Sequence, residues 1–289
     1  MEILRTVADL RHWSRTSRCK AQNNASPSFA LVPTMGALHT GHASLIRAAA
    51  SSCEHVAVSI FVNPTQFGPN EDYARYPRSF DADCAIAEAE GATVIFAPSV
   101  EEMYPAGPPS QIATFVEVEG LSNRLDGLSR PGHFRGVATV VAKLFNAAEP
   151  DLAFFGQKDA AQVAVLRRMV ADLRLATKIV VCPIVRESDG LALSSRNVYL
   201  SPAERAQAAI LNRTIRHVES LVAAGQRHAS ALIAAAREIF ATEPAVRVDY
   251  IELVDWDNLQ PIDTASPGSL FAVAAWVGAT RLIDNTILS

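Results

Sequence analysis

Short, nearly continuous apolar runs recur through the first two thirds of the chain. Runs of this kind are typical of strands that are buried on both faces of a parallel sheet. The predicted strands are Phe29–Val32, His55–Val62, Thr93–Ala97, Thr114–Val118, Pro150–Phe155 and Lys178–Val181, with one more short strand at the N-terminus.

Stretches with apolar residues at helical spacing separate these strands. They begin near Gly41 and at Ala160, and they cover Phe80–Glu90 and Val137–Ala147. Strands that alternate with helices are typical of an α/β protein with a parallel sheet. The pattern therefore predicts a doubly wound parallel sheet.

The pattern changes after Ser201. Ser201 as N-cap, Pro202 at the first helical position and Glu204 predict the start of a helix that runs to about Ala223. The remaining elements fit a small α+β domain with an antiparallel sheet. They are a helix at Ala229–Ala241 and strands at Arg247–Val254, Ser269–Val277 and Thr280–Ile287. We therefore predict domains at residues 1–184 and 185–289, with the linker near residues 183–189.

Two histidines lie at the start of the helix that follows the first buried strand. The N-terminus of a helix presents unpaired backbone N–H groups and favours phosphate. His39 and His42 flank it, with Gly41 between them. Both rings can donate to a polyphosphate, or one can protonate a leaving oxygen. The alternative is a helix cap and a surface side chain.

Amides follow the next strand. Because the carboxyl ends of neighbouring parallel strands meet in one crevice, we expect Asn63 and Gln66 to lie near the two histidines. Uncharged amides suit a hydroxyl or carboxylate substrate. A simple Asn-Pro turn would explain Asn63 but not Gln66.

A strand-end lysine repeats this arrangement later in the chain. Lys158 can reach a triphosphate as a point charge, and Asp159 can cap the following helix or hold Mg²⁺. Gln162 lies one turn further on and faces the same way. In the loop at 194–196, two hydroxyls and a guanidinium suit a phosphate chain, although such residues also occur in ordinary polar loops.

A stretch rich in glycine and cations, Gly127–Gly136, precedes the helix expected from Val137. Such loops act as mobile covers that face phosphates. A basic surface turn explains the same composition equally well. Arg130, in this stretch, is a candidate substrate-binding residue.

Composition excludes several classes of protein. A net charge of −4 over 289 residues gives no basic excess of the kind seen in nucleic-acid-binding proteins. No window approaches a membrane span, and the N-terminus has no secretory pattern. Cys19, Cys53, Cys84 and Cys182 are widely spaced, which argues against zinc and a disulfide framework. These features predict a cytoplasmic protein that binds neither nucleic acid nor membrane.

Several motifs together resemble the pantothenate synthetase (pantoate–β-alanine ligase) family, part of the nucleotidyltransferase superfamily with the His-x-Gly-His motif. The resemblance covers nearly the whole chain and includes its ending, Ala279–Asn285. The motifs are Pro33–His42, Phe61–Phe67, Gly132–Val137, Phe155–Asp159 and Ser194–Asn197.

The resemblance implies a Rossmann-like domain of the nucleotidyltransferase type and an ATP-dependent reaction in two steps with Mg²⁺. Pantoate attacks the α-phosphorus of ATP to give pantoyl adenylate and pyrophosphate. The amine of β-alanine then attacks the acyl carbon, which releases pantothenate and AMP. The resemblance also implies a homodimer.

Residue roles follow from the matching positions. His42 would be the proton donor and His39 a phosphate contact, with Lys158, Ser194, Ser195 and Arg196 also catalytic. Gln66, Gln162, Asn63 and Arg130 would serve pantoate and β-alanine. ATP would be bound by Met35, Gly36, Ala37, Leu38, His39, Thr40, Gly41, His42, Gly156, Gln157, Lys158, Asp159, Val185, Leu193, Ser194, Ser195 and Arg196.

Three positions depart from the family pattern: Ala43 where Leu is common, Gln157 where Glu is frequent, and Leu193 where Met usually stands. Only Gln157 bears on polar chemistry, because it could weaken a metal or ribose contact. The metal ligands stay unassigned. The alternative functions are another nucleotidyltransferase with the His-x-Gly-His motif, such as a nicotinate or phosphopantetheine adenylyltransferase, and a nucleotide-binding regulator with an inactive site.

Overall fold

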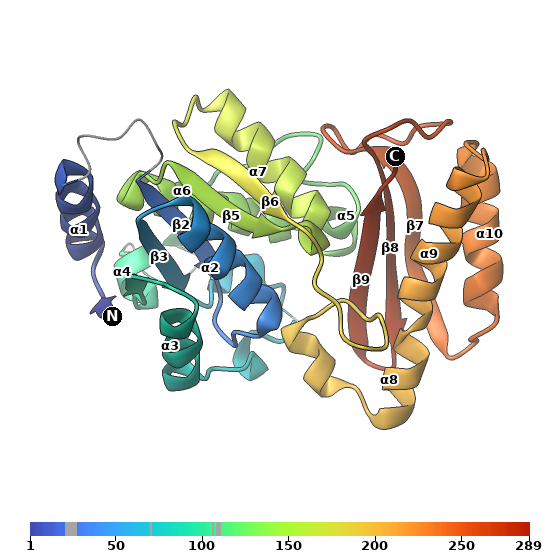
Figure 1. Cartoon of the computed structure of the whole chain (residues 1–289), viewed down its shortest axis with the longest axis horizontal. Coiled ribbons are helices and arrows are strands. Elements are labelled where there is room, and N and C mark those ends of the chain that lie inside the picture. The colour runs from blue at the N-terminus through green and yellow to red at the C-terminus, as the bar shows by residue number, and fades with distance from the viewer. Residues whose placement is uncertain (21–27, 70, 106, 108–110) are drawn as a thin grey trace. The chain divides into compact units, whose positions relative to one another are not determined.

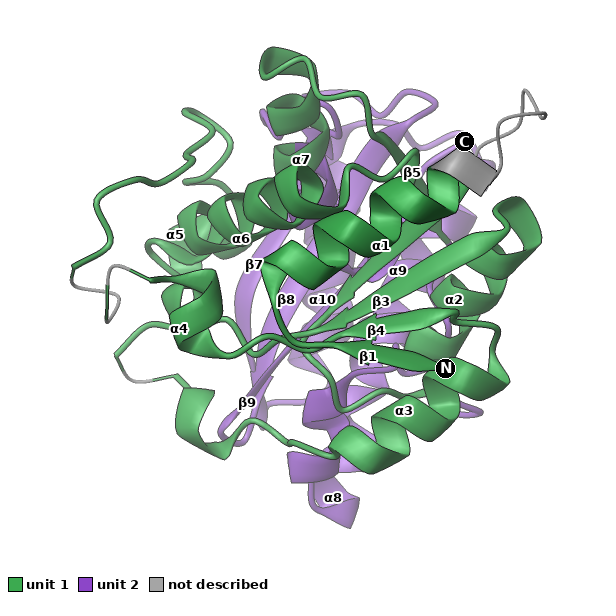
Figure 2. Ribbon diagram, turned by 90° about the vertical axis from the view of Figure 1, so that its left-hand side faces the viewer, with its two compact units in different colours: residues 1–156, 165–182 green, residues 157–164, 183–289 purple. Residues whose placement is uncertain are grey.

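The computed structural model describes residues 1–20, 28–69, 71–105, 107 and 111–289. Most of the polar loop that the sequence predicts at Lys20–Ser28 lies outside the described residues. The chain forms two compact units (Figure 2). The first is Met1–Gly156 with Val165–Cys182, and the second is Gln157–Ala164 with Pro183–Ser289.

A six-stranded sheet in the order β1-β4-β3-β2-β5-β6 forms the first unit, and every pair is parallel. β3 and β4 lie on one side of β2, whereas β5 and β6 lie on the other. The strand order therefore reverses at β2, which is where open sheets bind ligands. The strands are β1 (Glu2–Leu4), β2 (Phe29–Thr34), β3 (His55–Ile60), β4 (Val94–Phe96), β5 (Leu152–Gly156) and β6 (Lys178–Cys182).

Helices cover both faces of this sheet, so the predicted doubly wound α/β class is confirmed. Figure 2 shows α2 and α3 on one side and α1 and α6 on the other. Ala30 and Val32 of β2 pack with Ile46 of α2, as the alternation of side chains along a strand requires. The helices are α1 (Val7–Lys20), α2 (Thr40–Ser52), α3 (Phe80–Ala89), α4 (Val100–Met103), α5 (Asp126–Ser129), α6 (His133–Ala148) and α7 (Ala160–Asp172).

The second unit contains a three-stranded antiparallel sheet in the order β7-β8-β9. Figure 1 shows α9 and α10 side by side along it, and its core includes Leu211, Phe240, Phe271 and Val273. The predicted small α+β domain is therefore confirmed as a fold. The elements are α8 (Pro202–Ala208), α9 (Ile210–Ala223), α10 (Ala229–Ala241), β7 (Val246–Asp255), β8 (Ser269–Val277) and β9 (Thr280–Ile287).

Two predicted elements were wrong. Residues 114–118 form no strand; they run beside α6, where the backbone N–H of Val116 donates to Thr139 Oγ1 at 2.9 Å. Thr139 of α6 bonds to the backbone of Val116, and Ser122 accepts from the N–H of Val118, so side chains rather than another strand pair with this backbone. The helix expected from Pro202 to Ala223 is two helices, because Ala209 (ψ −16°) lies between α8 and α9. Both helices are apolar on one side, so periodicity alone does not reveal the break.

Candidate functional site

A tight loop joins β2 to α2, and the predicted ATP-binding residues Met35–His42 lie on it and on the first turn of α2. Gly36 (φ +82°) and Ala37 (φ +51°) take left-handed conformations in this loop. A Cβ on Gly36 would lie 2.9 Å from Asp83 Oδ2. Glycine at this position therefore allows the loop to lie directly on a carboxylate.

That carboxylate belongs to α3. Asp83 is 1% exposed, and it accepts hydrogen bonds from the backbone N–H groups of Ala37 (2.9 Å) and Leu38 (2.8 Å) and from Ser79 Oγ (3.0 Å). Two of the loop's N–H groups are thus occupied by the protein. The predicted site residues do not include Asp83, because nothing local in the sequence connects it with a loop about 45 residues earlier.

The two histidines have a defined tautomer. His39 is the N-cap of α2, and its Nδ1 accepts from Gly41 N at 3.1 Å. His42 Nδ1 accepts from His39 N at 3.4 Å. Because a backbone N–H can only donate, both Nδ1 atoms are unprotonated and Nε2 carries the hydrogen of each neutral ring. The ring centroids are 4.1 Å apart, so the two rings lie side by side at the N-terminus of α2.

Asn63 shapes the turn after β3. Its Oδ1 accepts from Thr65 N (3.3 Å) and from Tyr104 OH (2.8 Å), and its Nδ2 donates to Gln66 Oε1 (3.1 Å) and Gly136 O (3.2 Å). The amide thus has protein partners on both atoms, as the turn alternative expects. Its contact with a substrate stays a prediction.

Gln66 connects the ends of two neighbouring strands. Its Nε2 donates to Met35 Sδ at 3.0 Å, and β2 and β3 are paired over their whole length. The structure therefore brings Gln66 against the loop that carries His39, as the parallel sheet predicts. The side chain is 8% exposed.

Arg130 and His133 hold the backbone of Gln66. His133 Nδ1 lies 2.8 Å from Gln66 O, and Arg130 Nη1 lies 2.9 Å from His133 Nε2. Arg130 also forms a bidentate ion pair with Glu71, at 2.7 and 2.6 Å. Burial raises the pKa of the Glu71 carboxyl, but the hydrogen bonds and charge of Arg130 outweigh it, so the pKa lies below its ordinary range.

The stretch Gly127–Gly136 is not the loop that its composition suggests. It contains α5 and the first turn of α6, which begins at His133 rather than Val137. His133 and Phe134 are buried, and they form the first two residues of α6. A Cβ on Gly136 would overlap Thr65 O and lie 2.7 Å from Gln66 Cα. Glycine therefore allows α6 to pack directly on the 3₁₀ turn at Pro64–Gln66, the Gln66 turn.

In the second unit, Lys158 lies in a 3₁₀ turn that spans Gln157–Asp159. Lys158 Nζ is 3.5 Å from Asp159 Oδ1, and Asp159 is 48% exposed. Asn285 of β9 holds this turn: its Nδ2 donates to Gln157 O (3.0 Å) and Lys158 O (2.9 Å). Gln162 follows in the first turn of α7, partly buried.

Two more predicted ATP-binding residues face each other across a hairpin. Leu193 N donates to Val185 O at 3.0 Å, and Arg186 pairs antiparallel with Ala192. The predicted linker at 183–189 is the first arm of this hairpin. After it, Ser194 is the N-cap of a turn at Ser195–Tyr199 and its Oγ accepts from Arg196 N at 3.2 Å.

Ion pairs fix this hairpin from two sides. Arg186 forms a bidentate pair with Asp284 of β9, at 2.6 and 2.9 Å. Burial raises the pKa of the Asp284 carboxyl, and the hydrogen bonds and charge of Arg186 oppose that rise. Arg205 of α8 pairs with Glu187 (2.7 Å) and Asp189 (2.8 Å), which lowers the pKa of both carboxyls despite their partial burial.

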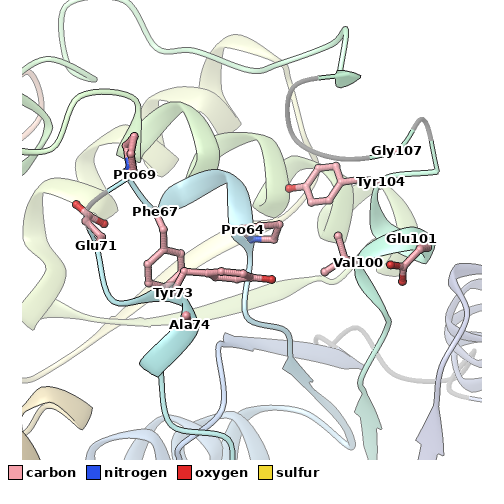
Figure 3. A pocket seen from close by; sticks show the side chains of 11 residues that line it. Pro64, Phe67, Pro69, Glu71, Tyr73, Ala74, Val100, Glu101, Tyr104 and Gly107 are labelled. Atoms are coloured by element: carbon pink, nitrogen blue, oxygen red, sulfur yellow. The ribbon is translucent and has the colours of Figure 1, made fainter.

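A cavity of about 670 Å³ lies beside the Gln66 turn in the first unit (Figure 3). Pro64, Phe67 and Tyr73 line one part of it, and Val100 and Tyr104 line another. Its walls are mainly apolar, with the Glu71 and Glu101 carboxylates at the edge. The predicted site residues do not line it.

Within the described part of the chain, no group of three or more His, Cys, Asp or Glu side chains could hold a metal ion. Asp159 remains a single half-exposed carboxylate next to the lysine. Magnesium commonly binds through one or two carboxylates together with substrate phosphates, and Asp159 fits that mode. No helix among the described residues is long and apolar enough to cross a membrane.

An α/β sheet that reverses at β2, with two histidine donors at a helix N-terminus there, defines a nucleotide-binding enzyme of the Rossmann-like class. The family model for pantoate–β-alanine ligase matches residues 2–287. The chain therefore belongs to the pantoate–β-alanine ligase family: it is an ATP-binding ligase of pantothenate biosynthesis that joins pantoate to β-alanine.

Individual proteins that this chain resembles are pantothenate synthetases as well. A pantothenate synthetase of Acidobacterium capsulatum is 58% identical over 287 residues, which cover 99% of this chain and 94% of that protein. One from Koribacter versatilis is 53% identical over 288 residues, covering 100% and 96%. The crystal structure of the Thermus thermophilus enzyme has a TM-score of 0.89 at 43% identity and covers 99% of both chains.

A further solved structure carries ligands. The pantoate–β-alanine ligase of Francisella tularensis, complexed with β-γ ATP and β-alanine, has a TM-score of 0.77 at 33% identity. The match covers 99% of this chain and 97% of that one.

Proposed function

We propose that this ligase activates pantoate as an acyl adenylate. A carboxylate oxygen of (R)-pantoate attacks the α-phosphorus of ATP, and the bond to the bridging oxygen breaks to release pyrophosphate. The β-alanine amine then attacks the acyl carbon, loses a proton and expels AMP. Adenylation is needed because a carboxylate has no good leaving group.

The observation that carries this proposal is the pair of histidine rings at the N-terminus of α2, where the Nδ1 atom of each accepts a backbone hydrogen bond. Two Nε2–H groups at the mouth of α2 can donate to phosphate oxygens, and the dipole of the helix adds to the attraction for anions. We assign the proton donor role to His42 and a phosphate contact to His39. The neighbouring residues Met35–Leu38, Thr40 and Gly41 bind ATP with them.

We assign further ATP contacts to residues in later segments of the chain. Lys158 supplies a positive charge for the triphosphate, and Ser194, Ser195 and Arg196 stabilise the charge that develops on it. Magnesium, bound with ATP, would neutralise phosphate charge, and Asp159 would supply its protein carboxylate. The remaining ATP contacts are assigned to Gly156, Gln157, Val185 and Leu193.

We assign pantoate to Gln66 and Gln162, with Gln66 also lining the β-alanine site. Asn63 serves the same substrates, and Arg130 acts next to Gln66. The division into a nucleotide and pantoate domain at 1–184 and a lid domain at 185–289 is part of this proposal. So are a homodimer and a cytoplasmic location, which suits the free thiols of Cys53, Cys84 and Cys182.

The decisive assay measures AMP release from ATP, Mg²⁺ and D-pantoate, with and without β-alanine. We expect AMP together with pantothenate only when β-alanine is present, and a loss of turnover on the order of 10²- to 10⁴-fold in His42→Ala if that ring is the general acid. His12→Ala is the control, because His12 is exposed on α1.

Two results would contradict the proposal. A stable nucleotide product without β-alanine would indicate an adenylyltransferase, and ATP binding without pyrophosphate release would indicate a regulator. Unchanged turnover in His42→Ala would remove the general-acid role alone.

A further inference from the structure

Asn285, near the end of β9, is the residue on which this inference rests. Its side chain is 4% exposed, and every polar group of its amide is used. Nδ2 donates to Gln157 O (3.0 Å) and Lys158 O (2.9 Å), while Oδ1 accepts from Gln157 Nε2 (3.3 Å). One buried amide thus fixes both the backbone and a side chain of the turn at Gln157–Asp159, the lysine turn.

The residue before it holds a different segment. Asp284 is 1% exposed, and both of its oxygens accept from Arg186, at 2.6 and 2.9 Å. Arg186 Nη1 also donates to Gly190 O at 3.1 Å, which closes the hairpin. The hairpin is followed by residues 194–196, the serine–arginine loop. Since successive side chains of a strand point in opposite directions, neighbours on β9 can hold two separate segments.

A second contact fixes the lysine turn within the same unit. Trp256 Nε1 donates to Ala160 O at 3.1 Å, at the start of α7. Residues 157–164 consequently belong to the second compact unit, although β5, which precedes them, belongs to the first. Lys158 and the serine–arginine loop therefore share one framework, built on β9.

We propose that Asn285 and Asp284 are positioning residues for adenylation: they set the Lys158 ammonium in register with the loop at 194–196, without touching substrate. This rests on the proposed function, which places both segments on ATP. A small displacement of a charged group relative to a reacting phosphate lowers the rate strongly, because alignment supplies much of the catalysis.

The same contacts explain why a glutamine at position 157 suits this structure. Both hydrogens of Asn285 Nδ2 are used on backbone carbonyls, so Oδ1 needs a donor. The amide of Gln157 supplies one, whereas a glutamate at 157 would set a carboxylate against that oxygen. Gln157 and Asn285 are thus a matched amide pair.

The test is Asn285→Asp, which keeps the shape and replaces the two donated hydrogen bonds by repulsion between oxygens. Adenylation is followed as pyrophosphate release from ATP and pantoate, and the second step as AMP release from supplied pantoyl adenylate and β-alanine. We expect kcat of the first step to fall at least about tenfold, with the KM for pantoate and the second step changed less than about threefold.

Asn258→Asp is the matched control, because Asn258 is exposed in a turn of the same unit. Asn285→Ala, which removes the contacts without adding charge, serves if Asn285→Asp does not fold. Adenylation at the wild-type rate, or an equal fall in both steps, would overturn the positioning role. A wild-type chain that makes no pantothenate would instead overturn the proposed function itself.

Discussion

His133 is held in one protonation state by its two neighbours. A guanidinium can only donate, so Arg130 Nη1 donates to His133 Nε2, and His133 Nδ1–H donates to Gln66 O. Burial, and then the charge of Arg130, lower the pKa of His133 to about 4. The neutral ring therefore holds Gln66 at neutral pH.

This predicts a specific loss of stability in mild acid. The folded pKa of His133 is about 4 and its ordinary value is 6.5. Between pH 6.5 and about 4, His133 is therefore protonated in the unfolded chain but neutral in the folded chain. The free energy of unfolding should fall by about 2 kcal/mol from this group between pH 7 and 5.

Thermal unfolding across that range, compared with His133→Gln, measures this contribution. The variant starts less stable but should depend less on pH, because its side chain does not titrate. Equal slopes in the two proteins would mean that His133 is not the group responsible.

At the scale of elements, α3 matters to the site through one carboxylate. It packs beside α2 and carries Asp83 to the loop between β2 and α2. The left-handed conformations of Gly36 and Ala37 bring two N–H groups to that carboxylate. The helix thus determines the shape of the proposed phosphate-binding loop from outside it.

Asp83→Asn tests this connection. One carboxylate oxygen becomes an NH₂ group that faces a backbone donor, so we expect about 1–3 kcal/mol of lost stability and a raised KM for ATP. Asp81→Asn is the control, because Asp81 is exposed in the same first turn. If the two variants melt alike and bind ATP alike, Asp83 does not shape the loop.

At the scale of the whole molecule, the chain crosses between its compact units more than once. Residues 157–164 belong to the second unit, and residues 165–182 return to the first. The compact units therefore do not meet at a single position of the sequence. The lysine turn is therefore part of the C-terminal unit in packing, although it follows a strand of the N-terminal one.

The proposed homodimer is also a property of the whole molecule. Sedimentation equilibrium at working concentration should give twice the chain mass of 31.0 kDa. The assay of AMP release at the same concentration connects the assembly with activity. A single-chain mass there would refute the homodimer and leave the ligase assignment intact.

The sequence by itself determined most elements, because strand and helix periods and caps are local. The strands at Ser269–Val277 and Thr280–Ile287 and the helix at Ala229–Ala241 have the predicted bounds. The strand-end motifs also predicted that Gln66 lies against the loop after β2, since parallel strands bring their carboxyl ends to one edge.

Only the tertiary structure decided which side chains hold the site in place. Asp83, His133 and Asn285 bond to segments 45, 67 and 127 residues away in the chain. Their partners are mostly backbone groups, which have no signature in the sequence. The motif around His133 was visible, but its burial was not, because burial depends on what packs against a residue from elsewhere in the chain.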